Sequence, residues 1–398
     1  MRKLAVVALV SVVACGGADT PVPVTGGGAA LGARAAPSAV LHAPVCPGPG
    51  GEGDARCHAR VVVDVNGNPH VTSGPAGLSP ADLQSAYALP AGGAGQVIGI
   101  VDAYDDPNAE SDLAVYRAQF GLPPCTTANG CFRKVNQNGG QGRYPRASQG
   151  WALEIALDLA MASATCPSCG ILLVEAQTSS LANLGAAVNT AVRLGATVVS
   201  NSYGAGEYPS ELSDELAYFD HPGVAITASS GDSGYGVSFP AASRFVTAVG
   251  GTTLARDASA RGWSESAWSG SGSGCSGYVA KPSWQQDASC AFRAVADVSA
   301  VADPSTGVSV YDSYGYGGRR GWFVVGGTSA SAPIVAGVYA LAGNASSVSY
   351  GSAPYSNRSG LFDVTAGSNG KCGTYLCAAG VGYDGPTGLG TPDGTTAF

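Results

Sequence analysis

The sequence predicts an α/β fold with a mainly parallel central sheet and helices on both faces of that sheet. Short apolar runs rich in β-branched residues recur along the chain, which is typical of strands buried on both faces. Helical stretches lie between these runs, and such alternation favours a parallel sheet. Of the 398 residues, 45% are apolar and only 12% are charged, so disorder throughout the chain is excluded. The net charge of −8 argues against a nucleic-acid partner, which would need a basic face.

The first residues are typical of an export signal. Met1, Arg2 and Lys3 precede a short apolar run over residues 4–14, which ends in small residues before Cys15. We therefore predict a signal peptide at residues 1–14. Residues 12–15 resemble a bacterial lipobox, so we expect the lipoprotein type, with lipid on Cys15 as the attachment to the membrane. The chain would then be exported and anchored to a bacterial cell envelope. The alternative is an ordinary signal peptide followed by secretion.

Three regions follow the predicted signal. Residues 15–40 are mostly Gly, Ala, Pro, Thr and Val with almost no charge, which is typical of a flexible tether. Residues 41–77 hold two cysteines and the apolar run 61–63, ended by an Asn-Gly-Asn-Pro turn, and predict a small disulfide-bearing appendage. Ser79 and Pro80 then form a helix start, with Ser79 as the cap. We therefore predict that the main domain covers residues 78–398.

Strands and helices alternate within the main domain. The pattern predicts strands over 96–102, 170–175, 197–201, 224–228 and 245–249, and helices over 151–163 and 181–194. A further apolar run at 322–325 leads towards a helix over 334–341, and the Gly/Ser-rich stretch 264–277 is interpreted as a surface loop. Active sites of such folds lie at the carboxyl ends of the strands.

The eleven cysteines become ten when Cys15 is set aside for lipid. The ten fall into five neighbouring pairs, for which an oxidising compartment predicts local disulfides. Zinc is the competing interpretation for Cys166 and Cys169, but no second close dyad and no spaced histidine accompany them. The pairs are Cys46/Cys57, Cys125/Cys131, Cys166/Cys169, Cys275/Cys290 and Cys372/Cys377.

Ser329 is a candidate nucleophile. It lies in the Gly-Gly-Thr-Ser-Ala-Ser-Ala-Pro stretch of residues 326–333, between an apolar run and a predicted helix. Small neighbours would let a substrate backbone come close, and a helix N-terminus offers unpaired N–H groups to a developing oxyanion. The alternative is that Ser329 only caps the helix.

Three carboxyl groups are candidate partners for this serine. Glu154 and Asp158 are four residues apart in an otherwise apolar helix, so both lie on one helix face, where burial would raise their proton affinity. The alternative is an ordinary solvated face. Asp232 follows a predicted strand in a Gly-Asp-Ser-Gly sequence, where it could close a turn or, if protonated, donate to an oxyanion.

These motifs together resemble the sedolisins, the serine-carboxyl peptidases, from about residue 78 to the C-terminus. The resemblance implies a subtilisin-like three-layer fold in which Ser-Glu-Asp replaces Ser-His-Asp. It implies that Ser329 is the nucleophile, that Glu154 is the general base and that Asp158 orients Glu154 through a shared proton. Asp232 would stabilise the oxyanion, and residues 201–204 match the segment that lines the substrate cleft. An ionised base beside a neutral Asp232 implies activity at acidic pH.

The resemblance also implies one structural Ca²⁺ ion near the C-terminus. Two carboxylates and backbone carbonyls form an oxygen-only set that suits this ion, although glycine-rich loops with carboxylates are often just turns. The implied ligands are the side chains of Asp363 and Asp384 and the carbonyls of Val364, Gly380 and Gly382.

One feature departs from the family. Sedolisins usually carry a long folded propeptide, whereas only about sixty residues separate Cys15 from residue 78. Two interpretations stay open: residues 41–77 are a reduced substitute that stays attached, or the main domain folds unaided. Activation by propeptide cleavage is therefore not expected.

We predict an exported, monomeric serine-type endopeptidase that acts on polypeptides through an acyl-enzyme on Ser329. The alternative is a non-catalytic surface lipoprotein that uses the same fold as a peptide-binding module. A subtilisin-type enzyme with Asp102 as triad acid is disfavoured, because no histidine lies in the required helix.

Overall fold

An eight-stranded, mainly parallel sheet forms the centre of the computed structural model, which describes residues 40–46, 48 and 53–398. Along the sheet the strands run β13-β12-β10-β8-β5-β7-β6, and β16 also pairs with β12. Only the pairing of β12 with β13 is antiparallel. The strands are β5 (Val97–Ala103), β6 (Phe132–Asn136), β7 (Gly170–Ala176), β8 (Val198–Asn201), β10 (Ala225–Ser229), β12 (Thr247–Arg256), β13 (Trp263–Ala267) and β16 (Val298–Val301).

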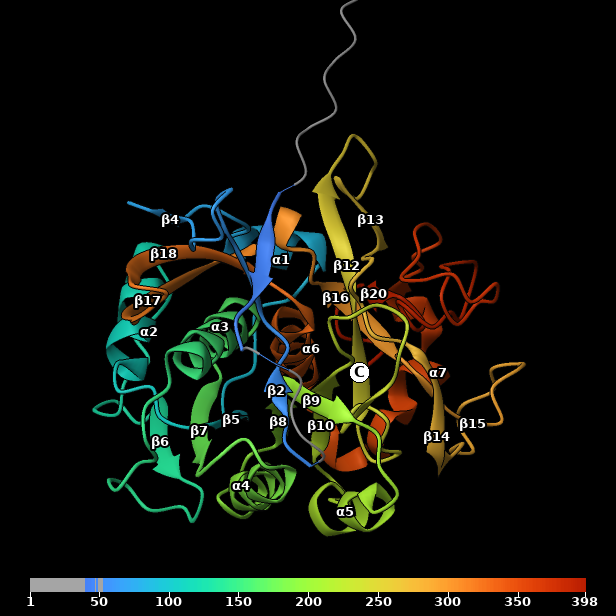
Figure 1. Ribbon diagram of the computed structural model, residues 1–398, viewed down its shortest axis with the longest axis horizontal. Coiled ribbons are helices and arrows are strands. Elements are labelled where there is room, and N and C mark those ends of the chain that lie inside the picture. Colours follow the sequence, from blue (N-terminus) through green and yellow to red (C-terminus); the bar gives the residue numbers. More distant parts are fainter. Residues whose placement is uncertain (1–39, 47, 49–52) are drawn as a thin grey trace, which may run out of the picture. The chain divides into compact units, whose positions relative to one another are not determined.

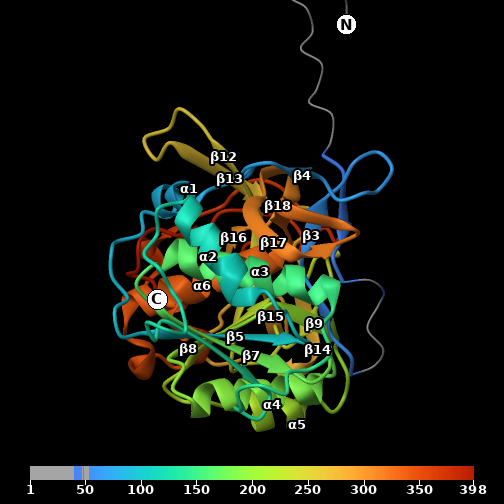
Figure 2. The same ribbon diagram turned by 90° about the vertical axis from the view of Figure 1, so that its left-hand side faces the viewer.

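Helices cover both faces of this sheet (Figures 1 and 2). On one face lie α3 (Gln149–Thr165) and α6 (Thr328–Ala342), with α1 (Pro80–Ala86) and α2 (Ala109–Gln119) packed on α3. On the other face lie α4 (Leu181–Arg193) and, beside it, α5 (Glu211–Tyr218). The short helix α7 (Ala353–Ser356) follows α6. The predicted α/β fold with flanking helices is confirmed, and each predicted strand and helix of the main domain has a counterpart.

Helices α3 and α6 approach each other closely, which matters because each carries candidate catalytic residues. Every residue of α3 from Trp151 to Thr165 is buried, so its carboxylates do not lie on a solvated face. At the contact, a Cβ on Gly337 of α6 would collide with the Thr165 side chain of α3. The absence of that atom lets the two helices lie side by side.

The helix predicted over 334–341 begins earlier, at Thr328, so that Ser329 lies in its first turn. Pro333 has no N–H to donate to the carbonyl four residues before it, which is that of Ser329. The Ser202 hydroxyl donates to this carbonyl instead, at 3.3 Å. The proline therefore leaves a backbone oxygen free to join α6 to the end of β8.

The interpretation of residues 264–277 as a surface loop is wrong. The stretch lies mainly in β13 and β14 (Gly274–Ala280), and Ser271 and Ser273 are fully buried. Their hydroxyls donate to the carbonyls of Pro386, at 2.8 Å, and Leu376, at 2.6 Å. Small polar residues can be buried when their hydrogen bonds are satisfied, so composition alone misplaced this segment.

The N-terminal strands are joined to two smaller sheets. β1 (His42–Pro44) pairs with β3 (Arg60–Val62), and β3 and β4 (Val71–Thr72) both pair with β18 (Arg319–Gly326), whose other neighbour is β17 (Val308–Tyr316). β2 (Arg56–Cys57) pairs with β9 (Tyr203–Gly206), which also pairs with β11 (Ser238–Phe239). Two short ladders complete the fold: β14 with β15 (Phe292–Val295), and β19 (Leu361–Phe362) with β20 (Thr391–Pro392).

All five predicted disulfides are confirmed, so zinc at Cys166 and Cys169 is excluded in this state. No helix in the described ranges is both long and apolar enough to span a bilayer. The predicted signal peptide at 1–14, Cys15 and nearly all of the tether lie outside the described residues.

Candidate active site

The candidate residues meet where the central strands end at their carboxyl edge. Asp102 is the penultimate residue of β5, Ser202 directly follows β8, and Asp232 follows β10. Glu154 and Asp158 reach this edge from α3, and Ser329 reaches it from the first turn of α6. The structure therefore brings together Ser329, Glu154, Asp158 and Asp232, which the resemblance named as catalytic.

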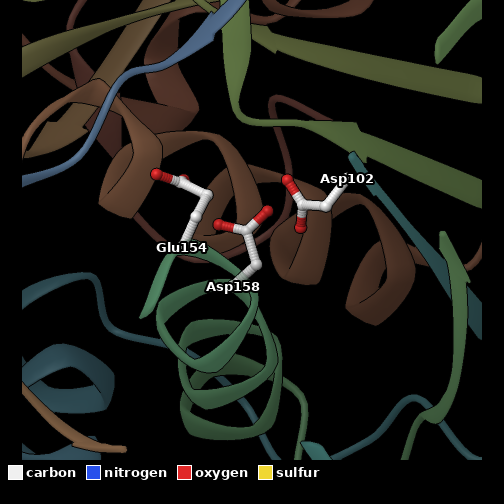
Figure 3. A group of neighbouring side chains, drawn as sticks. All are labelled: Asp102, Glu154 and Asp158. Carbon is white, nitrogen blue, oxygen red and sulfur yellow. The ribbon is translucent and has the colours of Figure 1, made fainter. Parts of the chain in front are cut away.

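Glu154, Asp158 and Asp102 form one buried carboxylate cluster (Figure 3). All three residues are fully buried, and one carboxylate oxygen from each lies within 4.8 Å of the other two. In Figure 3 the Asp158 carboxylate lies between those of Glu154 and Asp102. None of their six carboxylate oxygens accepts a hydrogen bond from the part of the chain that is described.

Burial and mutual repulsion raise the pKa of every member of the cluster. Burial is the largest cause for each carboxyl group. The charge of Asp158 further raises the pKa of both Glu154 and Asp102. Three charges cannot be held so close together out of water, so the cluster retains protons that its members share.

The Ser329 hydroxyl lies beside this cluster. It donates to the Ser202 carbonyl at 3.1 Å and makes no hydrogen bond to Glu154 in this conformation. It is still close enough to oppose part of the rise in the pKa of Glu154. A rotation of the serine side chain would exchange the Ser202 carbonyl for the Glu154 carboxylate, as a nucleophile and its base require.

Asp232 is held on the other side of the serine by the start of α6. Its Oδ1 atom accepts from the backbone N–H of Thr328 at 2.8 Å and from the Thr328 hydroxyl at 2.9 Å, while the buried Oδ2 atom has no partner. Burial raises the pKa of Asp232 to about 7, although the hydrogen bonds from Thr328 lower it. Below that pH, Asp232 can be a neutral donor through Oδ2.

Four of the C-terminal candidate metal ligands, Asp363, Gly380, Gly382 and Asp384, lie together. Asp363 Oδ2 accepts from the Gly382 N–H at 2.9 Å, and Asp384 Oδ2 accepts from the Gly380 N–H at 3.1 Å. Asp384 is fully buried, and burial raises its pKa to about 7; the hydrogen bonds from Thr387 and Gly380 oppose this rise, and the nearby charge of Asp363 adds to it. Two carboxylates joined with backbone oxygens are a donor set that fits a hard cation such as Ca²⁺.

The buried carboxylate cluster is a second place where a cation could replace shared protons. Its three carboxylates accept no hydrogen bond from the described residues, so charge alone would favour the binding of a divalent ion. Ca²⁺ takes six to eight oxygens, which is more than one oxygen from each of three carboxylates supplies. Shared protons need no further ligands.

Some residues of the site could not be predicted from the sequence. The sequence suggested Asp102 only as the acid of a disfavoured histidine triad. An aspartate inside an apolar strand, however, indicates a buried carboxyl group with a possible function. Thr328 and Ser202 lie in segments that the sequence singled out, but their contacts with Asp232 and with the Ser329 carbonyl involve backbone atoms and were not predicted. His58 lines a cavity with Asp232, and its Nδ1 atom is 2.8 Å from Ser229 Oγ, whereas the Ser329 hydroxyl donates to the Ser202 carbonyl.

The comparisons with known proteins agree with this arrangement. The matching family model, described as the subtilase family, covers residues 147–354. Kumamolisin of Bacillus sp. (strain MN-32) is 32% identical over 81% of this chain and 63% of its own length. Sedolisin of Pseudomonas sp. (strain 101) is 29% identical over 80% of this chain and 60% of its own length. The chain thus spans about three-fifths of these relatives.

The solved structure of Pseudomonas sedolisin, a serine-carboxyl proteinase complexed with two molecules of pseudo-iodotyrostatin, is also similar. It superimposes with a TM-score of 0.67 at 28% identity, covering 80% of this chain and 96% of the other. Sphericase shares the fold with a TM-score of 0.51 at 17% identity. The resemblance inferred from the motifs is confirmed.

The carboxylate cluster predicts how stability depends on pH. Its pKa values are higher in the folded protein than in the unfolded chain, so the unfolded state releases protons first as the pH rises above about 4. The free energy of unfolding should then fall between about pH 4 and 7, by up to about 1.4 kcal/mol per pH unit for each retained proton. Asp102→Asn should flatten this slope by about one proton in denaturant titrations.

The exposed Asp257→Asn change is a suitable control, and both variants are best made in the Ser329→Ala protein to prevent self-digestion. Equal slopes for Asp102→Asn and Asp257→Asn would contradict the shared-proton interpretation.

Proposed function

Because this chain belongs to the subtilase family and is similar to serine-carboxyl proteinases, we propose that it is an exported endopeptidase that hydrolyses polypeptides at acidic pH. The observation that carries the proposal is the buried carboxylate cluster beside Ser329 at a helix N-terminus. A binding module would gain nothing from three unpaired carboxyl groups in its core, since each is costly to bury.

In the proposed reaction Ser329 Oγ attacks the carbonyl carbon of the substrate, and Glu154 takes the hydroxyl proton. Asp158 and Asp102 hold the remaining protons and thereby keep Glu154 ionised without a full charge on every carboxyl group. The backbone N–H of Ser329 and the protonated Oδ2 of Asp232 stabilise the oxyanion. Glu154 then gives its proton to the leaving amine, and water releases the acyl group by the same steps in reverse.

The protonation states of two carboxyl groups set the acidic pH range in which the enzyme would be active. Asp232 must stay neutral to donate, which requires a pH below about 7. Glu154 must be the member of the cluster that has lost its proton, which sets the acid limit.

Ser329→Ala should abolish cleavage of a denatured protein at about pH 4, a loss of at least about a thousandfold. Glu154→Gln should cause a comparable loss, because the base is removed while the shape is kept. Release of peptides followed by mass spectrometry measures both. Wild-type protein that is folded yet cleaves no better than Ser329→Ala across the acid range would favour the peptide-binding alternative.

We further propose that Asp363, Asp384 and the carbonyls of Val364, Gly380 and Gly382 hold one structural Ca²⁺ ion. The like charge of Asp363 beside the buried Asp384 supports this, because a cation would neutralise the pair. The ion would brace the C-terminal loop and takes no part in the reaction steps above.

Chelation with EGTA should lower the melting temperature by several degrees, since an ion at about 100 times its Kd contributes about 2.7 kcal/mol. Asp384→Asn should start lower and respond little to chelator, whereas the control Asp257→Asn should respond like wild type. An unchanged melting temperature after chelation of wild-type protein would rule the site out. A full response in Asp384→Asn would place the ion elsewhere, with the carboxylate cluster as the next candidate.

Export and a lipid on Cys15 are also part of the proposal, supported by the apolar start of the sequence and by five disulfides, which form in oxidising compartments. Cys15→Ser should move the protein from the membrane fraction to the soluble fraction of the producing cells. Retention of that variant in the membrane fraction would contradict the lipid anchor.

A further inference from the structure

The segment Ala55–Arg60 crosses the candidate active site in an extended form. On one side β2 pairs with β9, with Arg56 opposite Gly204 and Cys57 opposite Tyr203 (Figure 1). On the other side the Ala55 N–H donates to the Ser179 carbonyl at 2.8 Å, and Asp54 forms a bridge with Ser180. A strand held by backbone bonds along both of its edges is a general way of binding a peptide.

The backbone of His58 lies at the reacting position. Its N–H donates to the Ser202 carbonyl at 3.1 Å, and its own carbonyl accepts from the N–H of Ser329 at 3.1 Å. A Cβ added to Gly327 would collide with both this carbonyl oxygen and Asp232 Oδ2, so the two oxygens border the same small space. The His58 carbonyl therefore lies between the two groups proposed to stabilise an oxyanion.

Side chains fix the segment in this register. The buried His58 ring is 2.8 Å from Ser229 Oγ through Nδ1, and Arg56 donates to Ser233 Oγ at 2.7 Å. A Cβ on Gly204 would lie 2.7 Å from the His58 ring, so a glycine is needed opposite it. A cavity of about 260 Å³ beside the ring is lined in part by Arg56, His58 and Asp232.

Contacts on both sides of the His58–Ala59 bond hold the segment in place. Before the bond, a disulfide joins Cys57 to Cys46. After the bond, the Ala59 carbonyl accepts from the Val45 N–H at 2.9 Å, and β3 pairs with β1. We call the described residues 41–46 and 53–63 the inserted hairpin.

We propose that the inserted hairpin is an internal, substrate-like occupant of the cleft and that His58–Ala59 is the peptide bond presented to Ser329. This inference rests on the proposed peptidase function, because it names the first bond that the site would meet. After a cut at this bond both cysteines remain in the fragment before it, and the pairing of β1 with β3 and of β2 with β9 keeps that fragment bound as an inhibitor, in contrast to a segment that leaves once it is cut.

Cleavage of the His58–Ala59 bond needs no reagent other than water. Ser329 Oγ forms a bond to the His58 carbonyl carbon, the bond from that carbon to Ala59 N breaks, and the serine proton passes through Glu154 to the new Ala59 amine. The amine stays close because β3 remains paired with β1 and β18, so it can re-form the peptide bond in competition with water. Cleavage of the hairpin is therefore slow, and the cleft stays occupied.

Acid favours release of the inserted hairpin. Burial and the charge of Arg56 lower the pKa of His58 to about 3 while the hairpin is in place, whereas a released histidine has a pKa near 6.5. The charged or titratable groups nearest to it are Arg56 and Asp232, and neutral Gly204 and Ser229 face it from β9 and β10. Below about pH 6.5 the released form binds a proton that the inserted form does not, so occupancy falls with pH.

Mass spectrometry and N-terminal sequencing of the purified protein test the presented bond. Wild-type protein held at about pH 4 to 6 should accumulate a chain that begins at Ala59, at a rate independent of protein concentration. Ser329→Ala should stay intact. The cut chain should retain the fragment that ends at His58 on gel filtration. Full cleavage of an added protein substrate with no cut after His58, or a cut there in Ser329→Ala, would overturn the assignment of the bond.

A binding experiment tests occupancy without any catalysis, and so separates failure of this inference from failure of the proposed function. The probe is a fluorescent peptide with the sequence of residues 54–61, with serine in place of Cys57, added to the Ser329→Ala protein. His58→Ala in that protein should strengthen probe binding about tenfold, because an anchoring hydrogen bond of the internal competitor is lost. The double change Cys46→Ser and Cys57→Ser should do the same.

Two matched controls accompany these variants. His70→Ala removes a histidine outside the cleft, and Cys125→Ser with Cys131→Ser opens a disulfide near α2 and β6. Neither should change binding of the probe. Equal binding by all of the variants would show that the hairpin does not occupy the cleft, whatever the activity of the enzyme.

Discussion

The repulsion among Glu154, Asp158 and Asp102 is the constraint on which the rest of the site depends. Three carboxyl groups buried within 4.8 Å of one another must share protons: Glu154 and Asp158 come from α3, which packs closely on α6, and Asp102 comes from β5. That packing also fixes Ser329 beside the cluster and Thr328 beside Asp232. The geometry and acid-base chemistry of the site thus depend on the packing of these two helices against the ends of β5, β8 and β10.

Main-chain groups beside the site bind an extended peptide segment. Main-chain donors and acceptors on β9 and at Ser179 bind the inserted hairpin. Because these groups belong to the backbone, they can bind any extended chain. The same edges that would hold a substrate therefore hold the protein's own N-terminal segment. In the proposed arrangement a short disulfide-closed hairpin occupies the cleft without a long propeptide.

Most of the main domain could be predicted because its signals are local. Apolar runs marked β5, β7 and β8, and the spacing of Glu154 and Asp158 placed both on one buried helix face. The stretch 264–277 was misread because its buried serines are satisfied by carbonyls more than a hundred residues away in sequence. The contact of His58 with Ser329 is likewise non-local and made by backbone atoms, which no side-chain pattern encodes.

The role of Asp232 is tested most directly by the pH dependence of kcat/KM for a short peptide substrate, measured in wild type and in Asp232→Asn. In the proposed mechanism, buried carboxyl groups act as acid and base while Asp232 stays protonated. Wild-type activity should fall as the pH rises through about 7, where Asp232 loses its proton. The asparagine variant should be slower overall but should lack that fall, because its amide donates at every pH. An equal fall of kcat/KM above about pH 7 in both proteins would contradict the role of protonated Asp232.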